Sequence, residues 1–299
     1  MTEDEALRPA GPAGGRTFPK NTARDPEPAA LKPGRSVAGE MRAERAALAI
    51  LDEIAREAAD PAAERPRRPA AEPAFILHAR PWSESSLVAD ALTLHHGRVF
   101  LIAKGAKRPG SNLRGLLTPF SPLKLTWTGR REAKILTRAE WMGVLPPLAG
   151  EALLSGFYVN ELVLRLTRRE DPHTGLFALY VRALEDLTGA EAVERQRALR
   201  RFEAGLLRLC GWEVRVSEGA GAARFMLRTT GDLAGVAQGA VLPPGVRTWP
   251  REEVEDVLAG RLEGPQALRA AREIYREAIE LRLERPLCTR RVLARLKHL

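Results

Sequence analysis

Five short apolar runs, separated by turn residues, occupy the stretch from Ala74 to Ala139. The runs cover residues 74–80, 86–93, 98–103, 123–128 and 133–139. Pro81, Gly97 and Gly129 stand between runs, where strands end or turn. Five short strands within about 70 residues predict a small all-β barrel or sandwich. The five-stranded OB-fold is the small barrel that matches this count, and it is a common platform for single strands.

After Pro146 the apolar residues recur at helical spacing instead. The first predicted helix ends near Arg168, the second covers about 173–187, and the third stops at Gly211. Further helices are predicted over 251–258 and 265–283, followed by a last short helix that Thr289 caps. Residues 212–250, rich in Gly and Pro, are expected to be irregular, with at most a short strand around Phe225. The predicted fold class is α+β multidomain, with an OB-fold β-barrel over 72–146 and an α-helical domain over 147–299.

Residues 1–71 have a different composition, rich in Ala, Pro, Gly and charged residues. Such a segment has too few large apolar side chains to offset its ordering entropy, so we expect a disordered extension. Within it, Met41–Ala59 shows helical spacing of Leu48, Leu51 and Ile54. A transient helix is favoured over a docking helix, because lone helices of this length are marginal.

The formal net charge of +9 favours polyanionic partners. Nucleic acid is the leading candidate, although ribosomal, membrane-surface and acidic-partner proteins share such a balance. The acidic start of the chain argues against a secretory signal, and no apolar run is long enough to span a bilayer. Only Cys210 and Cys288 are present, which excludes a disulfide framework or a four-cysteine zinc site within one chain. We expect a cytoplasmic protein with reduced thiols.

Basic residues are concentrated in the predicted barrel, where eleven Lys and Arg face five acidic residues between positions 72 and 146. The segment Lys104–Arg114 is punctuated by Gly and Pro, and Arg130 and Arg131 follow a turn glycine. Mobile cations beside glycines are typical of phosphate binding, so we predict phosphate contact by this loop. Nearby aromatic residues either stack on bases or, as we favour, fill the barrel core: Trp82, Phe100, Phe120, Trp127 and Trp141.

The sequence shows no familiar catalytic motif. The chain lacks the GxxxxGK[ST] phosphate loop and the GxSxG elbow, and its five histidines show no metal-ligand spacing. Cys210 lies on an apolar helical stripe, which predicts a buried, inert thiol. In the helical half, many basic residues have acidic neighbours and are expected to be ion-paired, while a minority is left to receive an acidic peptide tail or DNA. We therefore predict a protein that is not an enzyme and that binds no cofactor.

Several stretches resemble the RecO family of recombination mediators. The segments 74–87, containing Arg80-Pro-Trp-Ser-Glu84, and 96–108 resemble the opening of these proteins, and Leu113–Phe120 continues the similarity. Ser155–Leu162 resembles the first helix of the family's second domain. The resemblance covers about residues 72–299. Some members carry a four-cysteine zinc motif, which this chain cannot form, so we expect no metal site.

This resemblance implies a DNA-repair function. It implies binding of single- and double-stranded DNA, annealing of complementary strands, and loading of recombinase with RecR and sometimes RecF. An interaction with the acidic tail of single-stranded-DNA-binding protein is also implied, as is association with the nucleoid. The predicted DNA-binding residues are Arg80, Lys104, Lys107, Arg108, Arg114, Lys124, Arg130, Arg131 and Lys134.

Three alternative functions fit parts of the same sequence. The first is an OB-fold protein that binds RNA or the ribosome, and the second is an adaptor that mainly grips acidic protein tails. The third, an enzyme with an unrecognised site, is the least favoured because the catalytic motifs are missing.

Overall fold

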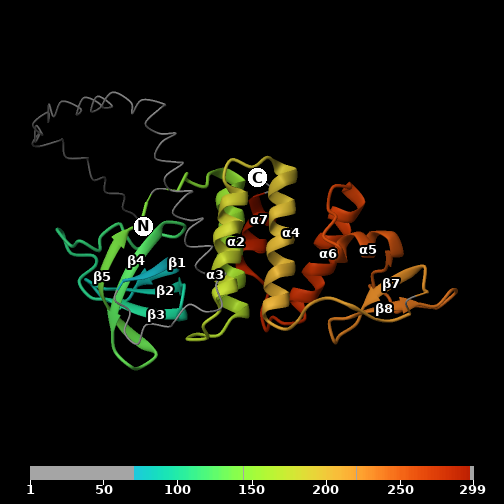
Figure 1. The fold of residues 1–299 in the computed structure, drawn as a ribbon, viewed down its shortest axis with the longest axis horizontal. Helices are drawn as coiled ribbons and strands as arrows, with labels where there is room; N and C mark the ends of the chain where they lie inside the picture. The colour runs from blue at the N-terminus through green and yellow to red at the C-terminus, as the bar shows by residue number, and fades with distance from the viewer. Residues whose placement is uncertain (1–70, 144, 220, 297–299) are drawn as a thin grey trace, which may run out of the picture.

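The computed structural model describes residues 71–143, 145–219 and 221–296, the last four without their side chains. Figure 1 shows a β-barrel at one end, helices in the middle and a second, smaller sheet at the other end. The predictions for the first 70 residues, including the segment Met41–Ala59, lie outside the described part of the chain.

The barrel consists of five strands that close on themselves in the order β1-β2-β3-β5-β4. Their bounds are β1 (Glu72–Pro81), β2 (Leu87–Thr93), β3 (Gly97–Ala103), β4 (Pro122–Thr128) and β5 (Ala133–Trp141). The neighbouring strands are antiparallel except for β3 and β5, which are parallel. The predicted OB-fold barrel is therefore confirmed.

Both faces of β1 and β2 are buried, although in different cores. Ala74, Ile76, Ala89 and Ala91 point into the barrel, where Trp127 also lies. The alternate side chains, which include Phe75, Leu77 and Leu92, belong to the core of the helical part. Because successive side chains of a strand point to opposite faces, two adjacent strands serve two cores at once.

The helices α2 (Gly150–Leu166), α3 (Thr174–Leu187) and α4 (Ala192–Leu209) form the middle of the molecule (Figure 1). The ring of Phe75 lies 5.7 Å from that of Phe177 and 5.3 Å from that of Tyr180, measured between centroids. These aromatic contacts join β1 to α3. Fully burying one such ring contributes about 1.5–3 kcal/mol of hydrophobic free energy.

A four-stranded sheet lies where an irregular segment was predicted. Its strands are β6 (Val216–Glu218), β7 (Arg224–Leu227), β8 (Leu233–Val236) and β9 (Trp249–Pro250), in the order β6-β8-β7-β9. The short strand expected around Phe225 is β7, but the other three strands were not predicted, because strands of two to four residues are too short to show an alternating pattern. Phe225, Leu233 and Trp249 are buried and pack this sheet onto the helical core.

Three further helices complete the described fold: α5 (Arg251–Leu258), α6 (Pro265–Glu280) and α7 (Cys288–Leu296). Within the described residues, no helix combines the length and the apolar character that a membrane span requires. The predicted helical character of this half is confirmed, with the small sheet as an addition.

The N-terminus of α7 is capped from another helix. Thr289 was the predicted cap, but the helix begins at Cys288, and the carboxylate of Glu161 in α2 accepts hydrogen bonds from the backbone N–H groups of both residues (2.7 and 2.8 Å). Burial acts to raise the pKa of Glu161, but these bonds outweigh it and hold the pKa below its ordinary value. A carboxylate at a helix N-terminus is favourable because it faces the positive end of the helix dipole.

Asn160 connects the barrel with two helices through its side chain. The residue is 2% exposed; its amide nitrogen donates to the carbonyl oxygen of Leu77 in β1 (2.8 Å), and its amide oxygen accepts from the hydroxyl of Tyr180 in α3 (2.7 Å). The asparagine therefore satisfies two buried polar groups that belong to different elements.

Replacing Asn160 by Ala should destabilise the protein strongly. The change leaves the Leu77 carbonyl and the Tyr180 hydroxyl buried without partners, at about 1–3 kcal/mol each. We expect the free energy of unfolding in urea to fall by roughly 2–4 kcal/mol. The control is Asn112→Ala in the exposed loop after β3, which should change it by less than about 0.5 kcal/mol. Equal effects of the two substitutions would contradict this account.

Candidate nucleic-acid interface

The turn between β1 and β2 lies against the loop that follows β3. The two meet because Leu87 at the start of β2 pairs with Ala103 at the end of β3. The backbone N–H of Lys107 donates to the carbonyl oxygen of Ser85 (2.9 Å), and its ammonium donates to that of Ser83 (3.1 Å). Turn and loop therefore form one connected surface at this end of the barrel, which we call the loop end.

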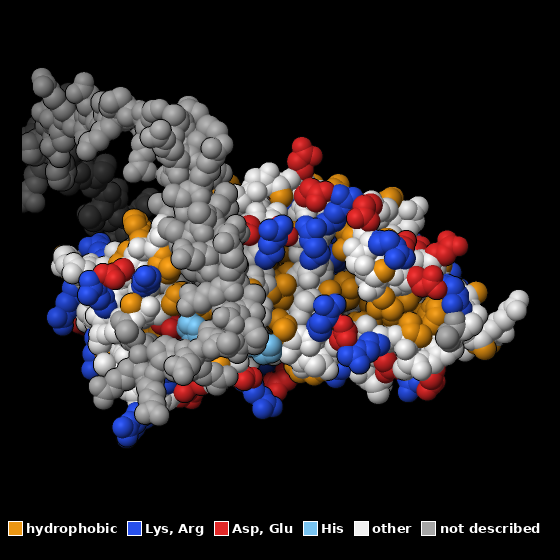
Figure 2. All heavy atoms as spheres, in the orientation of Figure 1, with side chains coloured by type: hydrophobic (Ala, Val, Ile, Leu, Met, Phe, Trp, Pro, Cys, Tyr) orange, Lys and Arg blue, Asp and Glu red, His pale blue; other side chains and the backbone are white. Residues whose placement is uncertain are grey.

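The loop end carries exposed cations without carboxylate partners. Among the described residues, none forms an ion pair with the five basic side chains of this surface, which are Arg80, Lys104, Lys107, Arg108 and Arg114. Figure 2 shows Lys and Arg side chains along the outer edge of the barrel, at the left of the view. Unpaired surface cations keep their full charge available to an anion, so this surface attracts polyanions.

The tip of the β4–β5 hairpin lies at the opposite end of the barrel. Because β3 and β5 run parallel with Phe100 beside Ala133, the residues before Ala133 lie toward the start of β3. Arg130 and Arg131 are exposed there, whereas Lys124 is exposed on β4 opposite Glu140. The predicted basic set is thus divided between two ends and does not form a single patch.

Lys134 differs from the other predicted residues. Lys134 is only 7% exposed. Its ammonium pairs with the carboxylate of Glu170 (2.7 Å) and donates to the carbonyl oxygen of Arg131 (3.2 Å). The chain turns back after α2 and brings Glu170 over β5, which local sequence does not reveal. Because this ammonium already has two partners and little exposed surface, we leave Lys134 out of the proposed interface.

The outer face of β2 and β3, through which OB-folds commonly bind ligands, is partly covered by the chain itself. The guanidinium of Arg169 lies over the ring of Phe100 in β3, 4.4 Å from its centroid. Arg169 also pairs with Asp90 in β2 through two nitrogens (3.0 and 3.2 Å). Phe100 is therefore engaged within the molecule and is not free to stack on a base.

Arg98 strengthens the same contact from the barrel side. It donates to Asp90 (2.8 Å) and to the carbonyl oxygen of Thr167 (2.8 Å), so one carboxylate holds two guanidinium groups. Gly97 allows this close approach: its φ is +65°, and a Cβ there would lie 2.1 Å from the carbonyl oxygen of Asp171. Sequence reasoning missed Asp90, because its partner Arg169 lies 79 residues further along the chain.

The five candidate aromatic residues have different environments. Trp127 is in the barrel core, as favoured, and Phe120 packs edge-on against Phe157 with centroids 5.1 Å apart. Trp82 and Trp141, in contrast, are 60% and 62% exposed. The prediction that these aromatics are core fillers is therefore wrong for these two, because both follow or end a strand and lie outside the alternating pattern.

Most basic residues of the helical part are ion-paired, as predicted. Arg195 pairs with Glu151, Arg197 with Glu194, and Arg201 with Asp186. A further pair, Arg200 with Glu203, is almost fully buried (2.7 Å). This balanced surface attracts polyanions less than the loop end does.

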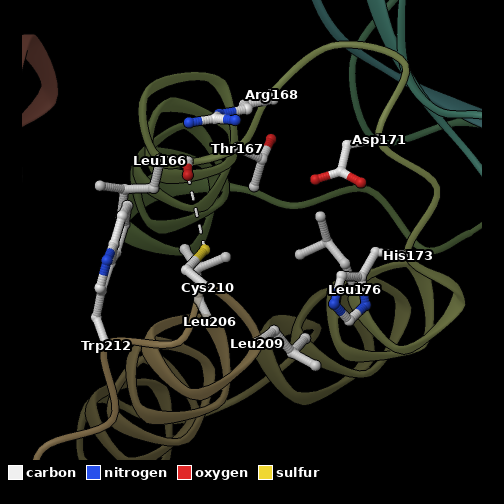
Figure 3. Close-up of a pocket in the computed structure, with 10 residues that line it drawn as sticks. All are labelled: Leu166, Thr167, Arg168, Asp171, His173, Leu176, Leu206, Leu209, Cys210 and Trp212. Carbon is white, nitrogen blue, oxygen red and sulfur yellow. Dashed lines mark hydrogen bonds between the residues drawn. The ribbon is translucent and has the colours of Figure 1, made fainter.

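A cavity of about 360 Å³ opens where the ends of α2 and α4 meet the start of α3 (Figure 3). Its walls are apolar and polar in similar measure, and Arg168, Asp171 and His173 supply charged and polar groups. The thiol of Cys210 lies 3.6 Å from the carbonyl oxygen of Leu166, and burial, together with the charge of Asp171, raises its pKa. The thiol is half-buried and not fully buried as predicted. The residues that line the cavity come from the ends of three helices, so no local sequence motif predicts it.

Metal ligands do not gather in the described part of the chain: no three His, Cys, Asp or Glu side chains come together there. The site is therefore a barrel surface of unpaired cations and exposed aromatics, together with one cavity in the helical part.

An OB-fold barrel joined to a helical part defines the general class, and comparison with known proteins gives the family. Residues 69–144 match the model for the N-terminal part of recombination protein O, and residues 148–291 match the model for its C-terminal part. The chain belongs to the RecO family.

Relatives with similar sequences carry the name DNA repair protein RecO. The one from Ralstonia nicotianae is 52% identical over 152 residues, which is 51% of this chain and 55% of that protein. The one from Burkholderia pseudomallei is 50% identical over 164 residues, or 52% and 59%. The one from Nitrosospira multiformis is 50% identical over 146 residues, or 49% and 60%. The chain thus spans little more than half the length of the relatives it matches.

Removing the carboxylate of Asp90 should loosen the contact between barrel and helices. Loss of one partner of a buried ion pair costs about 3–5 kcal/mol, and because Asp90 keeps some solvent contact we expect about 2–3 kcal/mol for Asp90→Ala. Thermal and urea unfolding measure this loss. The matched control is Glu140→Ala, which removes an exposed carboxylate paired with Arg138 and should cost less than about 1 kcal/mol. A loss no larger than that of the control would refute the role assigned to Asp90.

Proposed function

We propose that this protein is a DNA-binding recombination mediator. It binds single- and double-stranded DNA, anneals complementary strands and helps to load recombinase during recombinational repair. The observation that carries the proposal is the group of five unpaired cations at the loop end of an OB-fold barrel, in a chain of the RecO family. Phosphates are the anions that such a surface attracts when they occur in a chain.

The two basic ends of the barrel suggest how annealing is promoted. The loop end holds the backbone of one strand and leaves its bases free to pair. Arg130 and Arg131 at the hairpin tip offer a second cationic surface, on which the complement is brought up. Annealing becomes faster because the repulsion between the two phosphate backbones is offset. The protein carries out this work without covalent chemistry.

Protein partners belong to the same proposal. RecR, and in some cases RecF, act with this protein in loading recombinase, and the acidic tail of single-stranded-DNA-binding protein recruits it to DNA. The proposal places the protein in the cytoplasm, associated with the nucleoid. Support comes from membership of the RecO family, because the resemblance of this chain to that family implies these partners.

The cavity beside Cys210 favours a second function, that of an adaptor for acidic tails. The apolar part of its walls, which includes Leu209 and Trp212, suits an apolar side chain of a peptide, and the guanidinium of Arg168 suits a carboxylate. Asp171 stands at the same cavity and limits how many carboxylates enter.

A labelled peptide with the acidic tail of single-stranded-DNA-binding protein tests this adaptor function. Arg168→Ala should weaken peptide binding about tenfold, which corresponds to about 1.4 kcal/mol. The control is Arg182→Ala on α3, an exposed arginine that already pairs with Asp186, and it should leave the affinity unchanged. If both variants bind as the wild type does, the tail occupies another surface.

The DNA-binding function is tested by changing Lys104, Lys107, Arg108 and Arg114 together to Ala. Fluorescence anisotropy with a labelled single-stranded oligonucleotide, over a salt series, measures the affinity and its salt slope. Each phosphate contact contributes about 0.7 to the slope of log K against log salt, so the loss of four should flatten it by up to about 3. Affinity at low salt should fall at the same time.

The matched control removes the same amount of charge from the helical part. Arg182, Arg201, Arg208 and Arg215 are exposed, and each pairs with a carboxylate. Changing these four to Ala should leave the salt slope close to that of the wild type. Equal losses in the two quadruple variants would reject the loop end as the DNA surface. Tighter binding to RNA than to DNA of matched sequence would favour an RNA-binding protein instead.

A further inference from the structure

Trp82 exposes a large apolar ring on a short, well-ordered turn. The indole is 60% exposed, although aromatic side chains of this size are usually buried. Its backbone N–H donates to the carbonyl oxygen of Ser86 (3.1 Å), and the N–H of Ser86 donates to the hydroxyl of Ser83 (3.2 Å). The ring is therefore presented to solvent on a fixed backbone.

Unpaired cations surround this ring. The guanidinium of Arg80 lies 5.9 Å from its centroid, and the ammonium of Lys107 is held on the next residue, Ser83. Unlike Phe100, whose arginine is nearer and fixed by Asp90, Trp82 keeps 60% of its surface exposed and open to a base. Trp141 is as exposed as Trp82, but it follows the Arg138–Glu140 ion pair on β5. Trp82 therefore stands beside two cations, Arg80 and Lys107, that form no ion pair with the described residues.

An apolar ring beside cations matches the chemistry of a nucleotide in a single strand. The base offers a flat π-face, and the phosphates on both sides of it are negative. In a duplex the face of each base is covered by its neighbours, so a base reaches such a ring only after it leaves the stack. The ring therefore distinguishes unpaired from paired strands, whereas the cations do not.

We propose that Trp82 is a stacking site for an unpaired nucleobase, and that Arg80 and Lys107 hold the phosphates beside that base. The site gives the loop end its preference for single strands over duplex. This inference rests on the proposed DNA-binding function and adds to it the residue that recognises the base. Because every base has a π-face, the site is tolerant of sequence.

A membrane surface also attracts exposed tryptophan and basic residues, but the surroundings of Trp82 favour nucleic acid. The residues that follow it in the turn, Ser83, Glu84 and Ser85, are polar or acidic. Insertion into a bilayer interface needs further apolar side chains beside the ring, and these three residues supply none. The lysine and glycine residues of the adjoining loop, by contrast, suit a phosphate chain.

The experiment uses the full-length protein and two DNA ligands of equal length, an oligo(dT) single strand and a mixed-sequence duplex. Trp82→Ala should weaken single-strand binding about tenfold, in the range given by alanine substitutions of stacking aromatics. Duplex affinity and the salt slope should stay within about twofold of the wild type, because no cation is removed. Trp82→Phe, which keeps a ring, should recover most of the single-strand affinity.

Trp141→Ala is the matched control, because it removes an equally exposed tryptophan from the same barrel. It should leave both affinities unchanged, and thermal unfolding should show that all variants remain folded. The inference is overturned if Trp82→Ala and Trp141→Ala behave alike, or if single-strand and duplex affinity fall together. It is also overturned if Trp82→Ala reduces binding to phosphatidylglycerol vesicles while DNA binding is unchanged. Failure of the wild type to bind either DNA rejects the proposed function itself, which is a separate result.

Discussion

The structure depends on one buried contact between its two parts, the hydrogen bonds of Asn160. This buried side chain satisfies a carbonyl of β1 and a hydroxyl of α3, and so ties β1 to α2 and α3. Phe75 and Leu77 extend the contact into a continuous apolar core, and Asp90 closes its edge by holding two arginines. Barrel and helices are therefore joined through one continuous apolar core.

This contact decides which barrel surface is open. The segment after α2 covers part of the β2–β3 face, where Arg169 lies over Phe100. Asp171 lies close to Gly97 at the start of β3, whereas the loop end lies at the other end of this strand. The cations of the loop end have no acidic partner among the described residues. A common OB-fold binding face is thus used for an internal contact, and the proposed DNA surface lies on the loops instead. The same fold position serves a structural role here, in agreement with the rule that function resides in sites and not in folds.

The sequence predicted the elements with strong periodicity and failed where pairing is distant. The five strands and the long helices were predicted because alternation and 3.6-residue spacing are local properties. The partners of Lys134 and Asp90 were not, since they lie 36 and 79 residues away along the chain. The environment of each tryptophan was equally hidden: Trp127 is in the core while Trp82 is exposed, although both belong to the barrel. The family resemblance, by contrast, was readable from short motifs alone.

The division of β1 and β2 between two cores also has a consequence for folding during synthesis on the ribosome. The barrel strands are synthesised first, but Phe75, Leu77 and Leu92 find their partners only when α2–α4 have been made. Until then a newly made barrel exposes an apolar strip, and a truncated product that ends before α2 keeps it exposed for good. Early chain termination should therefore yield an aggregation-prone fragment and not a functional barrel domain. The barrel is for the same reason poorly suited to exist as an independent domain.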